Sequence, residues 1–433
     1  MTSAAAEQVV IRPLSPIEGW HAQRSITMWL SIRLRGSLDL RALAGALQSL
    51  RNAYPVLRCR IRLTGAGFLL VSQGEMETEP AFFVREEALP EAPALWPFAD
   101  GNNLVAVEVV SDGNEHWVSF GLHHAIADGR GAVHYFHWLW TAYTQITTTG
   151  VAPIAAPAAI PQAPEELLRE RGIVRLDHSG AERMDGVVWG GAALSHTGGY
   201  PLENQRRIVL DRQTSDALRR VVKTRGGSLN GLVCGAILKA ERSLVAAPER
   251  EPVALGLKYV VDVRSRVDPP IGTAEVTNCV AMAYSRLVVD AASDPVDIGR
   301  RIVSALDADV ASGLVPQQIY HAPTDQLDTA PVVFVTNIGE FGRFPLPDGL
   351  VIENVHGCME LVEAPLEQAR WAPEDQGIQL NWASGYQVSS YQGQLSIEAK
   401  YPAGSFSTEE IDRLAATVDA SLRGVADAER DTS

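Results

Sequence analysis

The clearest pattern of apolar and polar positions lies between residues 104 and 143. Two apolar runs, 104–110 and 117–122, flank the sequence Asp-Gly-Asn at 112–114, which favours a tight turn, so we expect a hairpin. The chain then becomes polar at His123, and apolar residues recur with i, i+3, i+4 spacing as far as Tyr143. This pattern predicts a buried strand, a short polar loop and an amphipathic helix in succession.

Similar patterns predict a mixed α/β chain on either side of this stretch. In the N-terminal part we expect a short helix capped by Ser15, a strand over 26–34, a helix that opens at Asp39, and a hairpin over 56–63 and 67–72. In the C-terminal part we expect strands at 207–210, 252–263, 277–289, 331–337 and 390–401, and helices at 214–225, 229–244 and 407–422. Small residues in the helix at 229–244, Gly231, Gly235 and Ala236, would permit close packing.

A break in composition separates the two parts. Residues 151–164 read VAPIAAPAAIPQAP, and four prolines in this stretch exclude a helix interior or a central strand. The chain stays polar, glycine-rich and weakly periodic to residue 204, apart from a short helix expected at 164–170. A chain of 433 residues is long enough for about two domains. We therefore predict an N-terminal subdomain over 1–150, a linker over 151–204 and a C-terminal subdomain over 205–433.

Composition and charge narrow the classes of function. A formal net charge of −15 disfavours nucleic acid as a partner, because a polyanion would be repelled. No apolar run approaches the ~20 residues that span a bilayer, and the first residues lack a signal peptide pattern, so we expect a cytoplasmic protein without an integral membrane segment. We expect a monomer, because the two domains would bury each other's apolar faces.

The cysteines do not indicate a metal or a disulfide. They are far apart in the chain, and none has CxxC or zinc-site spacing: Cys59, Cys234, Cys279 and Cys358. We expect four free thiols that act as small apolar side chains.

The candidate chemistry is concentrated in the sequence HHAIADG at 123–129. A lone histidine at a strand end is more often structural than catalytic, and Asp-Gly before a helix is usually a turn or a cap. Here, however, all fixed positions of an HHxxxDG pattern are matched, which chance would give in roughly one chain per thousand at this composition. A shared metal is not expected, because His123 and His124 on a strand would point to opposite faces. His134 and His137 are three residues apart on the next helix but have no carboxylate partner in the pattern.

HHAIADG resembles the signature of the coenzyme-A-dependent acyltransferase superfamily. This superfamily includes chloramphenicol acetyltransferase, the plant BAHD acyltransferases, condensation domains of nonribosomal peptide synthetases, wax ester synthases and polyketide-associated acyltransferases. Three more segments fit in the expected order: PLSP at 13–16, VDVRSR at 261–266 followed by Thr277-Asn278 and a strand at 279–287, and VTNIG at 335–339. The resemblance thus spans nearly the whole chain.

Departures from the family patterns disfavour some members of the superfamily. The plant-type DFGWG segment is absent, which disfavours a BAHD enzyme, and the chain has no room for the carrier and adenylation domains that usually surround condensation domains. Arg130 stands where condensation domains often carry a small polar residue. These departures favour a freestanding acyltransferase.

The resemblance implies a fold and a role for each matching residue. The fold would be two chloramphenicol-acetyltransferase-like α/β subdomains that form a V with a central tunnel. His124 would be the general base, for which an imidazole with an ordinary pKa of about 6.5 is suited, and His123 would support it. Asp128 would pair with Arg264 in the second domain and point away from the reacting atoms.

Three further residues receive roles from the same resemblance. Gly129 would let the backbone approach the pantetheine arm of the donor, because a Cβ there would occupy the tunnel. Thr336 and Asn337 would polarise the developing oxyanion.

We therefore predict an acyltransferase that moves an acyl group from a coenzyme A or carrier-protein thioester to an alcohol or amine, by direct attack without an acyl-enzyme. The acyl-CoA or phosphopantetheinyl thioester is a co-substrate, and no bound cofactor or metal is expected. Two alternatives stay open. One is a freestanding condensation-type domain that joins carrier-bound substrates, and the other is a catalytically inactive carrier-docking protein with the same fold.

Overall fold

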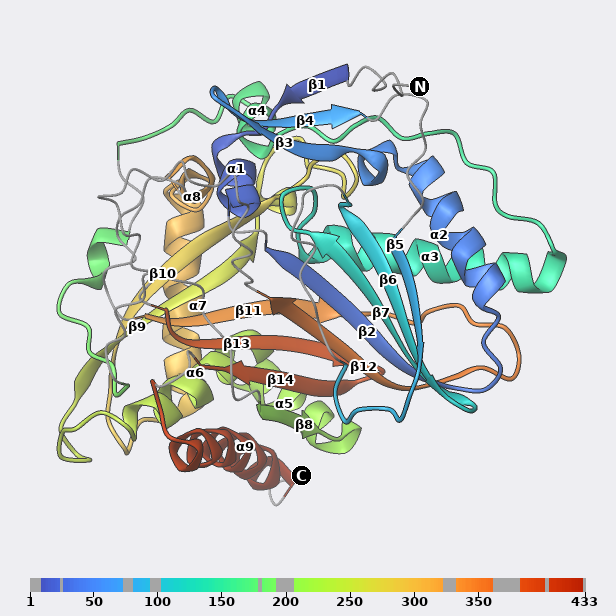
Figure 1. Cartoon of the computed structure of the whole chain (residues 1–433). Helices are drawn as coiled ribbons and strands as arrows, with labels where there is room; N and C mark the ends of the chain where they lie inside the picture. Colours follow the sequence, from blue (N-terminus) through green and yellow to red (C-terminus); the bar gives the residue numbers. More distant parts are fainter. Residues whose placement is uncertain are drawn as a thin grey trace. The chain divides into compact units, whose positions relative to one another are not determined.

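The computed structural model describes residues 9–23, 26–72, 81–93, 103–177, 181–191, 206–321, 332–360, 382–401 and 405–430. Its strands form three sheets, with helices packed against them (Figure 1), so the predicted mixed α/β class is confirmed. Contacts between Cα atoms divide the chain into two compact units. Unit 1 comprises Met1–Gly172, Val267–Cys279 and Arg343–Asp375, and unit 2 comprises Ile173–Arg266, Val280–Gly342 and Gln376–Ser433.

Unit 1 is built on a five-stranded sheet and a three-stranded sheet. The five-stranded sheet has the order β12 (Val351–Glu360), β2 (Thr27–Arg35), β7 (Glu115–His123), β6 (Val105–Asp112) and β5 (Ala81–Glu86). The three-stranded sheet has the order β1 (Val9–Pro13), β4 (Gly67–Ser72) and β3 (Arg60–Thr64). Both predicted hairpins, β6–β7 and β3–β4, are confirmed, although residues 55–58 of the second form a 3₁₀ turn instead of strand.

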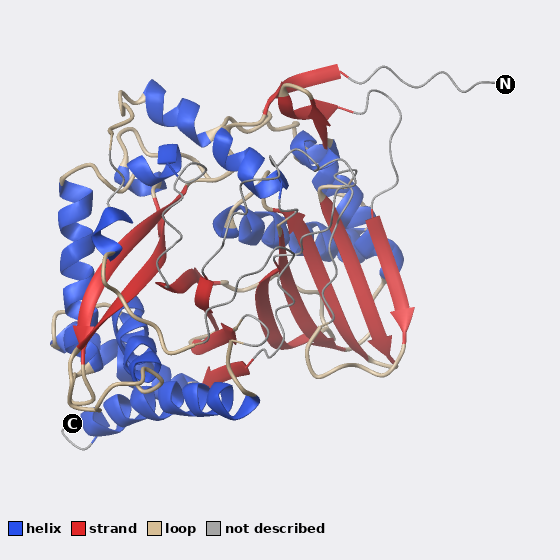
Figure 2. Cartoon of the chain, turned by 60° about the vertical axis from the view of Figure 1, so that its left-hand side comes forward, coloured by secondary structure: helices blue, strands red, loops and turns tan. Residues whose placement is uncertain are grey.

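Two helices cover one face of the five-stranded sheet (Figures 1 and 2): α2 (Leu40–Ala53) and α3 (Gly129–Thr149). α2 begins where predicted, since the Asp39 side chain accepts a hydrogen bond from the Ala42 N–H. α3 buries the apolar stripe expected from the sequence, and its Phe136 stacks on Phe120 of β7 with ring centroids 5.5 Å apart. This packing fixes the direction in which the chain leaves β7 and enters α3.

The compact units differ from the predicted division into 1–150, 151–204 and 205–433. Part of the predicted linker packs on unit 1: the Ala158 N–H donates to the Ala53 carbonyl, and Ser49 donates to the Pro153 carbonyl. The short helix within it, α4 (Pro164–Glu170), is present as predicted.

The predicted C-terminal subdomain is also not one continuous piece. β12 pairs with β2 along its whole length, so this segment belongs to unit 1. The physical reason is that pairing between strands more than 300 residues apart leaves no local signal in the sequence.

Unit 2 contains a six-stranded sheet with the order β10 (Val280–Val289), β9 (Val253–Asp262), β11 (Val332–Glu340), β13 (Trp382–Tyr391), β14 (Gln394–Lys400) and β8 (Arg206–Leu210). β11 runs parallel to both of its neighbours, and the other pairs are antiparallel. Its helices are α5 (Arg212–Thr224), α6 (Leu229–Arg242), α7 (Pro295–Ala311), α8 (Gln317–His321) and α9 (Thr408–Arg430).

Two of the predicted strands in unit 2 need correction. The stretch 390–401 is not one strand: it contains the end of β13, a turn and β14, because Gln392 and Gly393 adopt φ values of 48° and 85° and turn the chain. The strand expected from residue 277 starts only at Val280, and the three residues before it belong to unit 1. Alternation alone showed neither the turn at 392–393 nor the start of β10.

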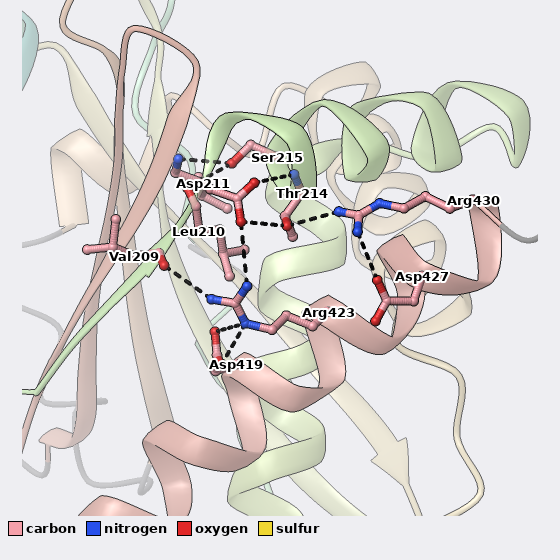
Figure 3. A network of polar contacts seen from close by, with 10 residues as sticks. Val209, Leu210, Asp211, Thr214, Ser215, Asp419, Arg423, Asp427 and Arg430 are labelled. Atoms are coloured by element: carbon pink, nitrogen blue, oxygen red, sulfur yellow. Dashed lines mark hydrogen bonds and ion pairs between the residues drawn. The ribbon is translucent and has the colours of Figure 1, made fainter.

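Polar contacts attach α9 to the start of α5 (Figure 3). Asp211 caps α5 by accepting a hydrogen bond from the Thr214 N–H, and it forms an ion pair with Arg423 of α9. Arg430, the last residue of α9, donates to the Thr214 hydroxyl. The apolar face of α9 is thereby held against unit 2.

The predicted close packing of α6 is confirmed. A Cβ atom built on Gly235 would lie 2.1 Å from the Pro295 carbonyl oxygen at the start of α7, and one on Gly231 would lie 2.8 Å from the Gly299 carbonyl oxygen. Both neighbours are backbone atoms, which cannot move as the end of a flexible side chain can.

We expect Gly235→Ala to lower the free energy of unfolding by about 1–3 kcal/mol, because the added methyl group must displace the α7 backbone. The matched control is Gly424→Ala on α9, where nothing lies within 4 Å of an added Cβ. That change should be neutral or stabilising by up to about 1 kcal/mol, through helix propensity. Urea unfolding of both variants tests the packing, and equal stabilities would contradict it.

Candidate active site

The two histidines of HHAIADG lie where β7 ends. His123 is the last residue of β7 and pairs with Thr27 of β2. The next backbone N–H, that of His124, donates to the Ile26 carbonyl at 2.7 Å. The chain then turns and enters α3 at Gly129. The rigid sheet therefore fixes the backbone from which both imidazoles project.

His123 has a structural environment that keeps it neutral. Its Nδ1 accepts a hydrogen bond from the Ala125 N–H at 3.1 Å, so the ring proton is on Nε2. Burial, together with the neighbouring His124, lowers the pKa of His123 to about 3. His123 thus closes the tight loop after β7, and its predicted supporting role in catalysis stays a prediction.

Asn278 determines which nitrogen of His124 carries the proton. The Asn278 amide nitrogen donates to the His124 carbonyl oxygen at 2.8 Å, because a carbonyl can only accept. The amide oxygen therefore faces Nδ1 of the imidazole, 3.0 Å away, and Nδ1 must be the donor. The proton of the neutral ring is on Nδ1, and the lone pair is left on Nε2.

The surroundings of His124 also favour the neutral ring. The residue is only 8% exposed. Burial lowers the pKa of His124 below its ordinary value, although backbone hydrogen bonds, the Asp128 charge and the bond to Asn278 act in the opposite direction. At neutral pH the imidazole is therefore unprotonated on Nε2 and able to accept a proton.

Asp128 is fully buried and holds the loop together. One carboxylate oxygen accepts from the Gly131 N–H at 3.0 Å and caps α3, and the other accepts from the Cys279 N–H at 2.7 Å. A catalytic triad would instead place this carboxylate on Nδ1 of His124, and that position is taken by Asn278.

A second buried carboxylate, Glu18 on α1 (Pro16–Gln23), holds the same segment from the other side. It accepts two hydrogen bonds from Arg12, each 2.7 Å long, and one from the Ser15 N–H at 2.8 Å. It also accepts from the Thr277 hydroxyl. The PLSP segment and the Thr277-Asn278 pair, which resemble family motifs far apart in the sequence, are thus bonded to one side chain.

Glu18, His21 and Asn278 were not predicted as site residues from the sequence. The only signal was that two of them lie in or beside segments that resemble the family. The bonds from Asn278 to His124 and from Thr277 to Glu18 connect residues more than 100 positions apart, and so does the stacking of the His21 ring on that of His124.

The other predicted site residues are described within their own units. Gly129 is the first residue of α3, and Arg264 begins the short 3₁₀ turn η3 (Arg264–Arg266) after β9, where it pairs with Asp262 at 3.2 Å. Thr336 and Asn337 lie on β11. The Asn337 side chain is exposed, donates to Asn230 and accepts from the Gly339 N–H. Their predicted roles stay predictions.

Within the described ranges, no group of three or more His, Cys, Asp or Glu side chains could hold a metal ion. Cys59, Cys234 and Cys279 are buried free thiols, and the side chain of Cys358 lies outside the described part of the structure. No described helix has both the length and the apolar composition needed to cross a membrane.

Comparison with known structures defines the class of protein. The chain matches polyketide synthase associated protein 5 from Mycobacterium tuberculosis with a TM-score of 0.77 and 26% identity, over 96% of this chain and 99% of that one. The first condensation domain of the calcium-dependent antibiotic synthetase matches with a TM-score of 0.65 and 13% identity, over 98% and 97% of the two chains. The fold is therefore that of the condensation-domain and chloramphenicol-acetyltransferase-like acyltransferases.

Sequence comparison gives a matching family model and named relatives. Residues 200–400 match the family model described as phthiocerol/phthiodiolone dimycocerosyl transferase C-terminus. Proteins named phthiocerol/phthiodiolone dimycocerosyl transferase are 28% identical to this chain in both Mycobacterium tuberculosis and Mycobacterium leprae, over 90% of this chain and 92% of each relative. The resemblance predicted from the motifs is confirmed: the chain is an acyltransferase, and it is similar to these transferases over most of its length.

The assigned tautomer of His124 can be tested at Asn278. We expect Asn278→Leu, which removes both hydrogen bonds at similar volume, to lower kcat by roughly tenfold to a hundredfold, less than loss of the base itself. Asn278→Asp should raise the pKa of His124, because a carboxylate facing Nδ1 favours the imidazolium, and the acid limb of the kcat/KM profile should move to higher pH. Wild-type turnover in a folded Asn278→Leu variant would contradict the assignment.

Proposed function

We propose that this acyltransferase moves an acyl group from a phosphopantetheine thioester, held on coenzyme A or on a carrier protein, to a hydroxyl or amine acceptor, with His124 as the general base. The observation that carries the proposal is the pair of hydrogen bonds between Asn278 and His124, which leaves the lone pair on Nε2. A neutral, buried imidazole with a fixed tautomer suits proton abstraction.

The proposed reaction needs no covalent intermediate on the enzyme. The acceptor O–H or N–H gives its proton to Nε2 as its heteroatom attacks the thioester carbonyl carbon. The tetrahedral oxyanion then collapses, the C–S bond breaks, and the departing sulfur takes the proton back from Nε2. The products are the ester or amide and the free thiol, and His124 is again neutral.

The relatives support a lipid acceptor. They are named as transferases of dimycocerosyl groups to phthiocerol or phthiodiolone, and they align over 90% of this chain. A catalytically inactive carrier-docking protein is less well supported, because such a protein has no need for a buried base whose tautomer is fixed by a dedicated side chain. Gly129, Thr336 and Asn337 keep their predicted roles in donor binding and oxyanion stabilisation as part of this proposal.

The first test removes the base. His124→Ala should lower turnover of an acyl thioester by about 10²–10⁴-fold, with the fold preserved. In the wild type, kcat/KM should fall only below pH 6.5, because the pKa of His124 is lowered and the base is lost when the ring is protonated. Release of free thiol, measured over pH 5–8 with a panel of acyl-CoA and acyl-carrier donors, gives both quantities.

The matched control for this test is His137→Ala, which removes an exposed histidine from α3 and should leave turnover unchanged. Intact-protein mass spectrometry during turnover should show no acylated enzyme. Near-normal activity of folded His124→Ala would remove His124 from the mechanism, and an acyl adduct would exclude direct attack.

The predicted ion pair of Asp128 with Arg264 is a separate proposal. Both side chains are buried, and removal of one partner from a buried pair costs about 3–5 kcal/mol. We expect Asp128→Ala and Arg264→Ala each to lower stability and activity, and the double variant to lose less than the sum. Additive losses in thermal unfolding would exclude the pair.

A further inference from the structure

His21, outside the HHxxxDG motif, lies face to face with His124. The two imidazoles are 4.0 Å apart between ring centroids and only 4° from parallel. His21 lies near the end of α1 and is 5% exposed, and its ring is nearly perpendicular to that of Trp20, with the ring centroids 5.0 Å apart. All three residues belong to unit 1. A buried parallel contact of this kind covers one face of the candidate base.

The backbone fixes the same arrangement. The Ile26 N–H donates to the His21 carbonyl at 3.2 Å, and the Ile26 carbonyl accepts from the His124 N–H at 2.7 Å. Ile26 therefore bridges the two histidines. At the other end of α1, Glu18 is bonded to Thr277, the residue before Asn278. The ring of His124 is thus held at its Nδ1 edge by Asn278 and on its face by His21, and both supports depend on α1.

The stacking also bears on charge. The His21 ring keeps water from one face of His124, so it is part of the burial that lowers the pKa of His124 and keeps the imidazole neutral. The charged and titratable groups on the described elements around the two rings include His123 and Asp128 beside His124, and Glu18, bonded to Arg12, on α1. Further ones are Arg130 on α3, Cys279 beside Asp128, and Glu165, which accepts from the Ile17 N–H of α1. Asn278, from the third surrounding segment, is uncharged.

We propose that His21 is a positioning residue, whose ring orients the His124 imidazole and shields its face from water so that Nε2 stays available as the base. This inference rests on the proposed role of His124. The flat ring is the feature that matters, so an aromatic side chain of similar shape should replace it, and a small one should not.

The test compares His21→Ala with the ring-conserving His21→Phe. In His21→Ala water reaches the face of His124, so its pKa should rise toward 6.5, and kcat should fall by about tenfold as the ring loses its orientation, with a smaller change in donor KM. In His21→Phe the pKa of His124 should stay at its wild-type value, and kcat should stay within about threefold of wild type.

The pKa of His124 is read by NMR of protein labelled with ¹³C-histidine, with His124→Ala used to assign its signal. This readout needs no substrate. If wild-type protein transfers no acyl group, the proposed function fails, and the NMR titration still decides whether His21 controls the base. His21→Leu, which keeps volume without a flat ring, replaces His21→Ala if the latter does not fold. Unchanged pKa and kcat in the folded Ala or Leu variant would overturn the inference, as would equal losses in the Phe variant.

Discussion

The site is organised by two buried carboxylates, each of which must be given hydrogen-bond donors. Glu18 and Asp128 are both fully buried, and a buried charge without donors is costly. Glu18 accepts from the Thr277 hydroxyl and Asp128 accepts from the Cys279 N–H. Asn278 lies between these two anchors, so its amide is set opposite His124. The tautomer of the candidate base is thus a consequence of how two carboxylates elsewhere in unit 1 are satisfied.

In this arrangement the residues of HHAIADG make different contacts. His123 closes the loop after β7, Asp128 caps α3 and holds the segment 277–279, and His124 presents its lone pair. The aspartate therefore acts through Asn278 instead of contacting the base itself. The sequence predicted His124 as the base and Asp128 as a structural residue that points away from the reacting atoms. The contacts of Asp128 with the Gly131 and Cys279 N–H groups are those of a structural residue.

The relatives and the fold indicate the class of enzyme, and they do not indicate its substrates. The relatives and the fold define an acyltransferase, while the acyl group and acceptor depend on side chains that differ among proteins with one fold. In this chain the imidazole of the candidate base is in direct contact with the Asn278 amide and the His21 ring. Both lie outside the HHAIADG sequence, so each can be changed without altering it.

The sequence by itself determined the local elements and the identity of the motif. Apolar periodicity and capping residues placed β6, β7, α2, α3 and α6 to within a few residues, because these signals arise from neighbours along the chain. The helix α7 was not predicted, although Asp294 and Pro295 are ordinary start signals. Only the tertiary structure decided that β12 pairs with β2 and that Asn278 and His21 meet His124. Those contacts join residues about 100 to over 300 positions apart, and distant pairing is specified by the packing of the whole unit, not by any pattern within one segment.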